Sequence, residues 1–400
     1  MKQKIVIRNL GPIKHADIDI KPLTVLIGES GSGKSIIMRT MSMCKWVIKK
    51  TRLKSLNTLN SNRIRLDTIL KNSMLDDFFT KDTSIEFFID DNIVLSIQNN
   101  KLNINFKKNL PQNYPYNKIL FLNENRVALP EILSTPGGRR IKLSTYTNDM
   151  IENFYEASNF YNNEASNFYN NGFSLNTMPI KLSKKDLPFG NTQYYIENND
   201  KKIKFEHASS GEKNSAILEM ILKYFVDDRL WFDNALEYFD KSIEKILLTL
   251  QLDKDVRTKI LNAKQNNITT KLSAFIEEPE ANLFPTNQMK MLYFLISMVN
   301  NNNEPEIVFA THSPYMLTAL NNSLHASYVL KITKNNENKV YEIIKKEYII
   351  DEENVAAYII ENGEAKNILE DGLIDADKID KASSDIMDDF SRLCDLDDEF

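Results

Sequence analysis

The chain has 400 residues and 42% of them are apolar, which is enough for one large core or two modest ones. Its formal net charge of −5 argues against a uniformly basic surface that coats nucleic acid. The densest apolar run, residues 291–296, is far shorter than a membrane span, and the two cysteines have neither metal-binding nor redox spacing. The N-terminal apolar run is too short for a signal peptide, so we expect a soluble, cytoplasmic protein without a membrane partner.

The first half of the chain alternates between strand-like and helix-like segments, which predicts an α/β fold. Residues 1–27 contain two or three short strands, and a helix is expected from residue 36. The stretch from about residue 50 to 204 is rich in Asn, Lys, Tyr and Phe. Strand-like pieces in it predict an inserted α+β region with a small antiparallel sheet, at 84–89, 93–97 and 119–122.

The second half shows regular patterns again. A helix with one apolar face follows Gly211, and two apolar strands are expected at 272–276 and 307–310. Beyond them we expect a hairpin that pairs 328–332 with 340–344, then two short helices and an acidic tail. The predicted parts of the chain are therefore 1–49, 50–204, 205–349 and 350–400.

A complete phosphate-binding loop follows the apolar strand at 24–27, and it reads Gly28-Glu29-Ser30-Gly31-Ser32-Gly33-Lys34-Ser35. The glycines let successive backbone N–H groups point at phosphates, above the positive end of the helix that follows. Lys34 can reach the β- and γ-phosphates, and the Ser35 hydroxyl can bind Mg²⁺. The sequence therefore predicts binding of ATP with Mg²⁺.

Two adjacent carboxylates, Glu277 and Glu278, follow the apolar strand at 272–276. Such a position, at the carboxyl end of a buried strand, is where ligands bind in parallel α/β sheets. Two close charges repel unless a cation lies beside them, and a magnesium-bound triphosphate supplies it. We therefore expect Glu277 to hold magnesium, directly or through water, and Glu278 to act as general base toward the attacking water.

The next strand delivers His312, one strand–helix–strand step after the carboxylate pair. A neutral imidazole there can hydrogen-bond the γ-phosphate and help to hold the attacking water. The predicted catalytic residues are thus Lys34, Glu278 and His312. A further small-residue segment, Ser209-Ser210-Gly211-Glu212, opens the helix that follows it and can form a second anion site, although the same pattern is common in helix caps.

Together these motifs resemble an ABC-type ATPase head, a P-loop NTPase with a mixed sheet and helices on both faces. The resemblance is to the soluble branch related to SMC, RecF and overcoming-lysogenization-defect (OLD) proteins. It is carried by residues 7–14, 276–281 and 311–314, at both ends of the chain, and leaves 50–200 largely unmatched. Residues 121–126 also resemble a strand-then-arginine segment of OLD-like ATPases.

The resemblance implies that Ser209, Ser210, Gly211 and Glu212 form the signature motif, which contacts ATP held by another subunit's phosphate loop. The chain would then act as an ATP-sandwich dimer or a higher homo-oligomer. It departs from the usual pattern at Ser210, where a glycine is common, and at Glu277, where many relatives have aspartate. No glutamine can be assigned to the Q-loop, and Asn282 and Phe284 stand where relatives often carry histidine.

Two functions from different classes remain open. In the first, ATP drives an oligomeric switch that controls a separate effector, a nuclease or toxin, as in stand-alone OLD-like ATPases of bacterial anti-phage systems. In the second, the protein is a RecF- or SMC-like repair ATPase that clamps DNA. The acidic overall charge and acidic tail favour the first. A basic run favours the second, and it comprises Lys45, Lys49, Lys50, Arg52 and Lys54, followed by Arg63 and Arg65. The simpler interpretation of both charged stretches is a solvated face and a solvated tail.

One segment is repeated letter for letter, since residues 156–163 recur at 164–171. A period of eight with two copies fits no solenoid. We interpret it as a tandem duplication tolerated in an exposed segment, with an aromatic contact surface as the alternative.

Overall fold

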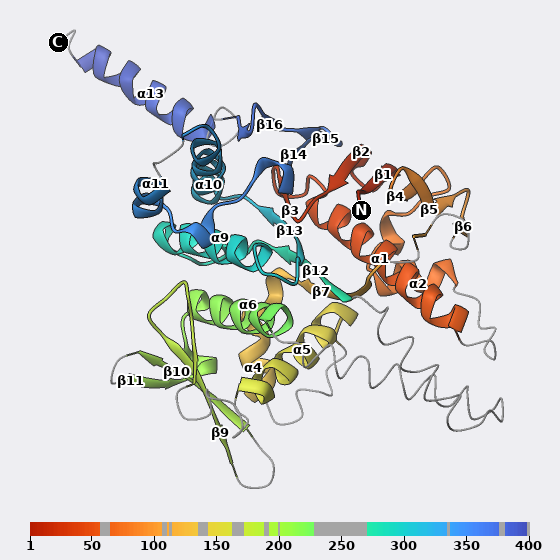
Figure 1. The fold of residues 1–400 in the computed structure, drawn as a ribbon, viewed down its shortest axis with the longest axis horizontal. Coiled ribbons are helices and arrows are strands. Elements are labelled where there is room, and N and C mark those ends of the chain that lie inside the picture. Colours follow the sequence, from red (N-terminus) through yellow and green to blue (C-terminus); the bar gives the residue numbers. More distant parts are fainter. Residues whose placement is uncertain are drawn as a thin grey trace.

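The computed structural model describes residues 1–56, 65–105, 110–111, 114–134, 143–161, 172–187, 192–198, 201–227, 270–333, 337–375 and 381–397. Its centre is an 11-stranded mixed sheet with the order β6-β5-β4-β1-β2-β15-β14-β3-β13-β12-β7 (Figure 1). The strands are β1 (Gln3–Leu10), β2 (Ile13–Ile20), β3 (Leu23–Ile27), β4 (Ser84–Ile89), β5 (Asn92–Gln98), β6 (Lys101–Ile104), β7 (Tyr116–Leu122), β12 (Thr270–Glu277), β13 (Glu306–Thr311), β14 (Val355–Glu361) and β15 (Glu364–Asn367).

The sheet has a parallel half and an antiparallel half. Strands β14, β3, β13, β12 and β7 run parallel, whereas β6, β5, β4, β1 and β2 pair antiparallel. The antiparallel pair β14–β15 joins the two halves, because β14 lies beside β3 and β15 lies beside β2. All five side chains of β3 are buried, as expected of a parallel strand covered on both faces.

Helices cover both faces of the parallel half. Alternate residues of β3 show this, since Leu23 and Val25 belong to one apolar core and Leu26 to the other. The first core contains apolar residues of α5 (Thr145–Tyr161), α6 (Ser210–Asp227), α9 (Pro285–Val299) and α10 (Pro314–Ile332). The second is formed with α1 (Lys34–Leu56) and extends under the antiparallel strands. The predicted α/β fold, with a mixed sheet and helices on both faces, is confirmed.

The strands predicted between residues 84 and 122 exist, but they join the main sheet. Strand β7 is its parallel edge, paired with β12, and β4–β6 extend its antiparallel half. A separate antiparallel sheet does form later in this region, from β8 (Phe173–Ser174), β9 (Lys181–Asp186), β10 (Thr192–Asn198) and β11 (Lys201–Lys204). Residue patterns located the strands, but the partner of β7 lies more than 150 positions away in the chain. The division at residues 50, 205 and 350 stays a prediction.

Two expectations for the C-terminal part are wrong. The expected hairpin is helical, because 328–332 ends α10 and Val340 lies in α11 (Glu337–Ile343). Apolar residues of the two helices pack on each other, with Ala326 and Val340 in one cluster, so the tertiary contact favours the helical spacing in these runs. Two short 3-10 helices follow, Lys346–Tyr348 and Glu352–Asn354, but the buried strand β14 comes after them, where only an acidic tail was expected. This run of Val355 to Ile360 is buried on both faces between β3 and β15, which suits a central strand.

The chain ends in a single helix, α13 (Lys381–Asp397), which projects away from the sheet and its helices (Figure 1). No helix in the described ranges is long and apolar enough to cross a membrane. The second copy of the repeated segment, 164–171, lies outside the described residues, and the first copy continues α5 as far as Tyr161.

Candidate nucleotide site

The phosphate loop connects the central strand β3 to helix α1. Gly28, Gly31 and Gly33 have φ values of 144°, 79° and 107°, which residues other than glycine rarely adopt. A Cβ at Gly28 would lie 2.6 Å from the carbonyl oxygen of Ile360 in β14, so the loop is packed closely on this neighbouring strand. At Gly31 no atom lies within 4 Å of the Cβ position, which leaves that side of the loop open. The loop therefore has the shape of a cradle for an anion.

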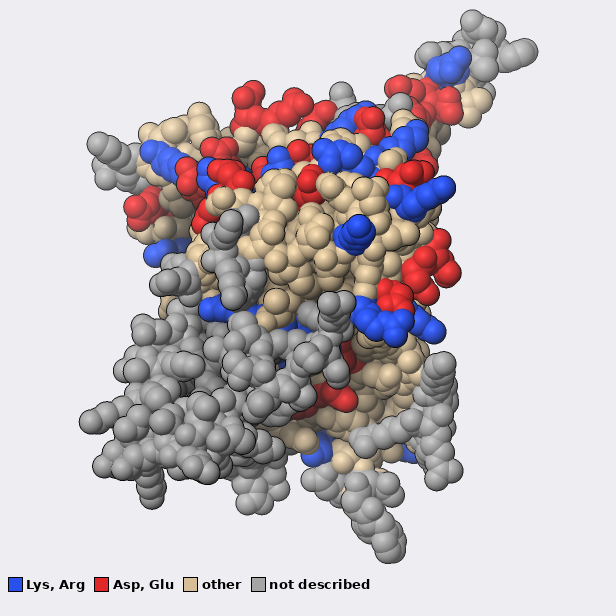
Figure 2. Space-filling view, turned by 90° about the vertical axis from the view of Figure 1, so that its right-hand side faces the viewer, with Lys and Arg blue, Asp and Glu red and all other residues tan. Residues whose placement is uncertain are grey.

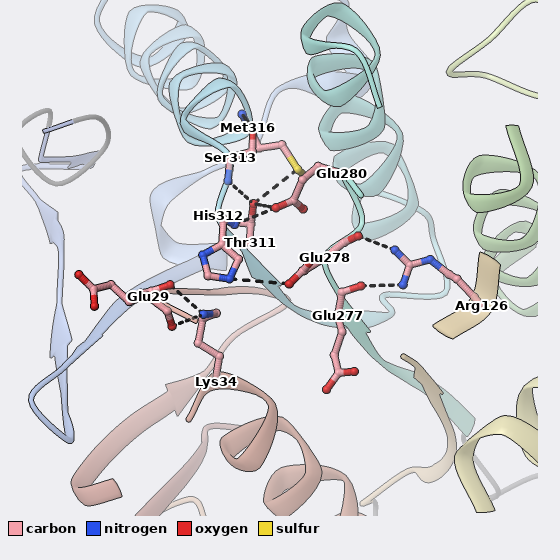
Figure 3. A network of polar contacts seen from close by, with 11 residues as sticks. Glu29, Lys34, Arg126, Glu277, Glu278, Glu280, Thr311, His312, Ser313 and Met316 are labelled. Carbon is pink, nitrogen blue, oxygen red and sulfur yellow. Dashed lines mark hydrogen bonds and ion pairs between the residues drawn. The ribbon is translucent and has the colours of Figure 1, made fainter. Parts of the chain in front are cut away.

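Lys34 lies inside this loop. Its Nζ donates to the carbonyl oxygens of Gly28 at 2.8 Å and Glu29 at 2.9 Å, and burial lowers its pKa (Figure 3). The Ser32 hydroxyl is buried and has no hydrogen-bond partner. A cation and an unpaired hydroxyl in a glycine-rich loop are the groups that phosphate oxygens accept from.

The two adjacent carboxylates lie at the end of β12, beside this loop. Glu277 is buried, and its Oε1 has no hydrogen bond and lies 3.7 Å from Nη2 of Arg39. A cavity of about 480 Å³ is lined by both carboxylates together with residues of the loop, of α1 and of β13, among them Lys34, Ser35, Arg39 and His312. The structure thus brings the predicted metal-binding and catalytic side chains to one cavity.

Magnesium fits this donor set. Mg²⁺ in nucleotide sites takes one or two protein oxygens and completes its shell with phosphate oxygens and water. On the same cavity, Ser35 offers a hydroxyl and Glu277 a buried carboxylate oxygen that has no hydrogen bond. In the described part of the chain, no group of three or more His, Cys, Asp or Glu could hold a metal by itself, so the phosphates would have to contribute.

His312 follows β13 and faces Glu278. The distance from its Nε2 to Oε1 of Glu278 is 3.7 Å (Figure 3). Burial and the nearby Lys34 cation lower the pKa of His312, although Glu278 opposes this. The imidazole is therefore neutral at neutral pH, and its N–H can donate a hydrogen bond to a phosphate oxygen.

Glu280 connects the carboxylate loop to His312. Its Oε1 accepts from the Thr311 hydroxyl at 2.6 Å and from the backbone N–H of His312 at 2.8 Å. Burial raises the pKa of this carboxyl group. The residue was visible in the sequence as part of Glu277-Glu278-Pro279-Glu280, but its role as a tether appears only when β12 and β13 are paired.

The segment Ser209–Glu212 lies at the N-terminus of α6, where it forms a capping box. The Ser209 hydroxyl accepts from the N–H of Glu212 at 3.3 Å, and the Glu212 carboxylate accepts from the N–H of Ser209 at 2.9 Å. Ser210 is exposed and Gly211 is buried. None of the four residues lines the cavities beside the phosphate loop that the described chain forms, so within one chain this segment does not complete the site.

Arg126 is the main site residue whose role sequence reasoning missed, although its segment had been noted. It follows β7 in a short 3-10 helix (Glu124–Ala128), is fully buried, and donates to backbone carbonyls of the carboxylate loop. Its partner on α6 is Asn214, 88 positions later in the chain. Glu124 lines the 480 Å³ cavity beside Glu277 and was not considered either. The strand-then-arginine resemblance of residues 121–126 pointed to this segment, but not to the bonds of Arg126, because its partners come from distant segments.

Among the described residues, the basic run after the phosphate loop is not wholly exposed. Lys45 is buried and its Nζ lies 2.7 Å from Oε1 of Glu306 in β13. Lys49 is largely buried, which lowers its pKa to about 8, and Lys50 lies over the ring of Trp46. On the face drawn in Figure 2, basic and acidic side chains are mixed and do not form one basic area. The side chains of Lys54 and Arg63 lie outside the described residues.

The chain therefore has an α/β fold in which a glycine-rich loop, two carboxylates and a histidine line one cavity. No protein-family model and no curated protein matches the chain. Similar solved structures include the SMC head domain from Thermotoga maritima, at 10% identity over 92% of this chain and 98% of that chain with a TM-score of 0.37. An SMC head with an extended coiled coil from Pyrococcus furiosus, bound to the C-terminal domain of ScpA, is 10% identical over 97% and 100%, with a TM-score of 0.38. The recombination mediator protein RecF is 10% identical over 92% and 98%, with a TM-score of 0.37. At such low values, function is argued from the residues of the site.

Proposed function

We propose that the protein binds and hydrolyses ATP as an ABC-type ATPase of the soluble SMC/RecF/OLD-like branch. The observation that carries the proposal is the single cavity shared by Lys34, Ser35, Glu277, Glu278 and His312. These side chains lie at or just after the carboxyl ends of the neighbouring parallel strands β3, β13 and β12, with Lys34 and Ser35 at the start of α1. A cation, a hydroxyl, two carboxylates and a neutral imidazole are the groups that phosphoryl transfer to water uses.

Each residue has a distinct part in the proposed reaction. Lys34 leaves its two loop carbonyls and stabilises the negative charge of the β- and γ-phosphates. Glu278 accepts a proton from the attacking water while the water oxygen bonds to the γ-phosphorus and the bond to the bridging oxygen breaks, releasing ADP. The neutral imidazole of His312 donates a hydrogen bond to the transferred phosphate. When bound at Ser35 and Glu277, Mg²⁺ supplies charge neutralisation.

The complete site would need a second copy of this chain. Ser209, Ser210, Gly211 and Glu212 lie away from the chain's own cavity, and Ser210 offers its exposed side chain at the N-terminus of α6. A helix N-terminus favours anions, so α6 of one copy can contact the γ-phosphate held by another. ATP would then join two copies, and nucleotide state would control assembly.

The output of this switch is proposed to be a separate effector. Helix α13 exposes four large apolar side chains, between 61% and 69% of each, namely Ile386, Met387, Phe390 and Leu393. Its sequence has five aspartates against one lysine and one arginine, which suits a partner with basic residues around an apolar groove. The resemblance to stand-alone OLD-like ATPases extends the proposal to an anti-phage system with a nuclease or toxin as effector.

The test begins with nucleotide binding by the purified protein. Lys34→Ala should abolish binding of a fluorescent ATP analogue, whereas Lys366→Ala, an exposed lysine on β15, should leave it unchanged. If Lys34→Ala binds as the parent does, the proposed site is wrong.

Mixing then tests the shared site. Ser210→Arg should hydrolyse no ATP, because the added side chain blocks the neighbouring copy while the capping box stays intact. An equal mixture with Lys34→Ala should recover about a quarter of the parental rate, since half of the dimers contain one intact site of two. A mixture as inactive as its two components would contradict the shared site.

A further inference from the structure

Arg126 is fully buried and hydrogen-bonds the backbone of the loop that carries the proposed general base, Glu278. Nη1 of Arg126 donates to the carbonyl oxygens of Asn123 at 2.8 Å and Glu277 at 2.6 Å, and Nη2 donates to that of Glu278 (Figure 3). Its Nε donates to Oδ1 of Asn214. Burial lowers the pKa of Arg126 to about 10, so the group stays charged at neutral pH. Burying a charge is unfavourable unless hydrogen bonds compensate, and here the guanidinium bonds to backbone carbonyls and to one side-chain amide.

Asn214, in helix α6, makes further hydrogen bonds to the same loop. It is fully buried one turn into the helix, and its Nδ2 donates to the carbonyl oxygens of Pro279 and Ala281, both at 2.9 Å. Both polar atoms of the side-chain amide are thus hydrogen-bonded, since its oxygen accepts from Arg126 and its nitrogen donates twice. The amide cannot turn over without placing its N–H groups against the guanidinium. Four carbonyls of the loop 277–281 are held by this pair.

The conformation of Glu278 needs such support. Its φ is +44°, a region that a glutamate adopts only when its surroundings hold it there. Its N–H donates to Ala310 at 2.9 Å, and its carbonyl accepts from Arg126. The first turn of α6 also touches the loop, because a Cβ at Gly211 would lie 2.6 Å from the carbonyl oxygen of Asn282.

We infer that Arg126 and Asn214 are positioning residues that make the placement of Glu278 follow helix α6. The inference rests on the proposed function, in which Glu278 is the base and the start of α6 contacts ATP of another copy. A shift of α6 on such contact is transmitted through Asn214 to the carbonyls of residues 279 and 281, and through Arg126 to those of 277 and 278. Hydrolysis then proceeds when α6 is engaged.

The test is a double-mutant cycle with Asn214→Asp. The aspartate still accepts from Arg126, but it loses the donors to Pro279 and Ala281. We expect kcat to fall by about tenfold or more in the parent, with the Kd for ATP within about twofold, because only the reacting geometry changes. In a Glu278→Gln background, where no base remains to be placed, the same change should alter the residual rate by less than about twofold. If Asn214→Asp does not fold, Arg126→Lys replaces it, since lysine keeps the charge but cannot span the same carbonyls.

The matched control is Asn321→Asp, because Asn321 in α10 also bonds backbone through both sides of its amide, at Ile374. It lies outside the site and should leave kcat unchanged. Equal losses of kcat in both backgrounds, a matching loss of ATP affinity, or no loss would overturn the inference while ATP hydrolysis by the parent stands. A parent that hydrolyses no ATP, or a Glu278→Gln variant as fast as the parent, would overturn the proposed function and the inference with it.

Discussion

Glu278→Gln should stop hydrolysis while leaving the fold and ATP binding intact. In the described structure the Glu278 carboxylate has one polar contact, at 3.7 Å to His312, and its side chain is 37% exposed. The bonds that hold this residue go to its backbone, which glutamine keeps. Losing the proton acceptor should lower kcat by about 10²–10⁴-fold, or about 3–5 kcal/mol of barrier. The unfolding free energy should change by less than about 0.5 kcal/mol.

Three measurements check this prediction: phosphate release with magnesium and ATP, binding of a fluorescent ATP analogue, and light-scattering mass with and without ATP. The variant should accumulate the ATP-bound oligomer, because assembly persists until hydrolysis. Glu370→Gln, which changes an exposed carboxylate on the short strand Leu369–Glu370, is the matched control and should behave as the parent. A parental rate of phosphate release by Glu278→Gln would refute the assignment of the general base.

Two further predictions concern a buried ion pair and the histidine. Lys45→Met should destabilise the protein by about 3–5 kcal/mol in urea unfolding, because Glu306 loses its cation, and adding Glu306→Gln should recover most of the loss. A Lys45→Met variant of parental stability that binds DNA more weakly would instead support the DNA clamp. For His312 the neutral imidazole is the active form and its pKa is lowered, so kcat/KM should fall only as pH drops below about 6.5. His312→Gln should lower turnover more than ATP binding and remove this acid limb; a limb that persists in this variant belongs to another group.

The acidic and basic segments show what a charge pattern in the sequence predicts about the structure and what it does not. The run of Lys45 and its neighbours was interpreted as a solvated face or as a contact for nucleic acid, but a run of lysines on a helix places some of them on the inner face. There Lys45 meets Glu306, a residue 261 positions away, and becomes part of the core. The acidic end of the chain forms helix α13, but the preceding strands β14 and β15 were not foreseen. Their burial depends on β3 and β2, which lie at the other end of the chain.

The sequence by itself predicted the candidate nucleotide site of this protein. The phosphate loop is eight contiguous residues between a strand and a helix, and Glu277, Glu278 and His312 each end an apolar strand, so local pattern was enough to find them. Tertiary structure alone decided what holds these groups in place. Arg126, Asn214 and Glu280 act through hydrogen bonds between segments far apart in the chain, and a local pattern cannot predict such bonds even where it marks one of the residues. Short motifs thus predict the chemistry of the site, whereas the geometry of the site depends on packing between distant segments.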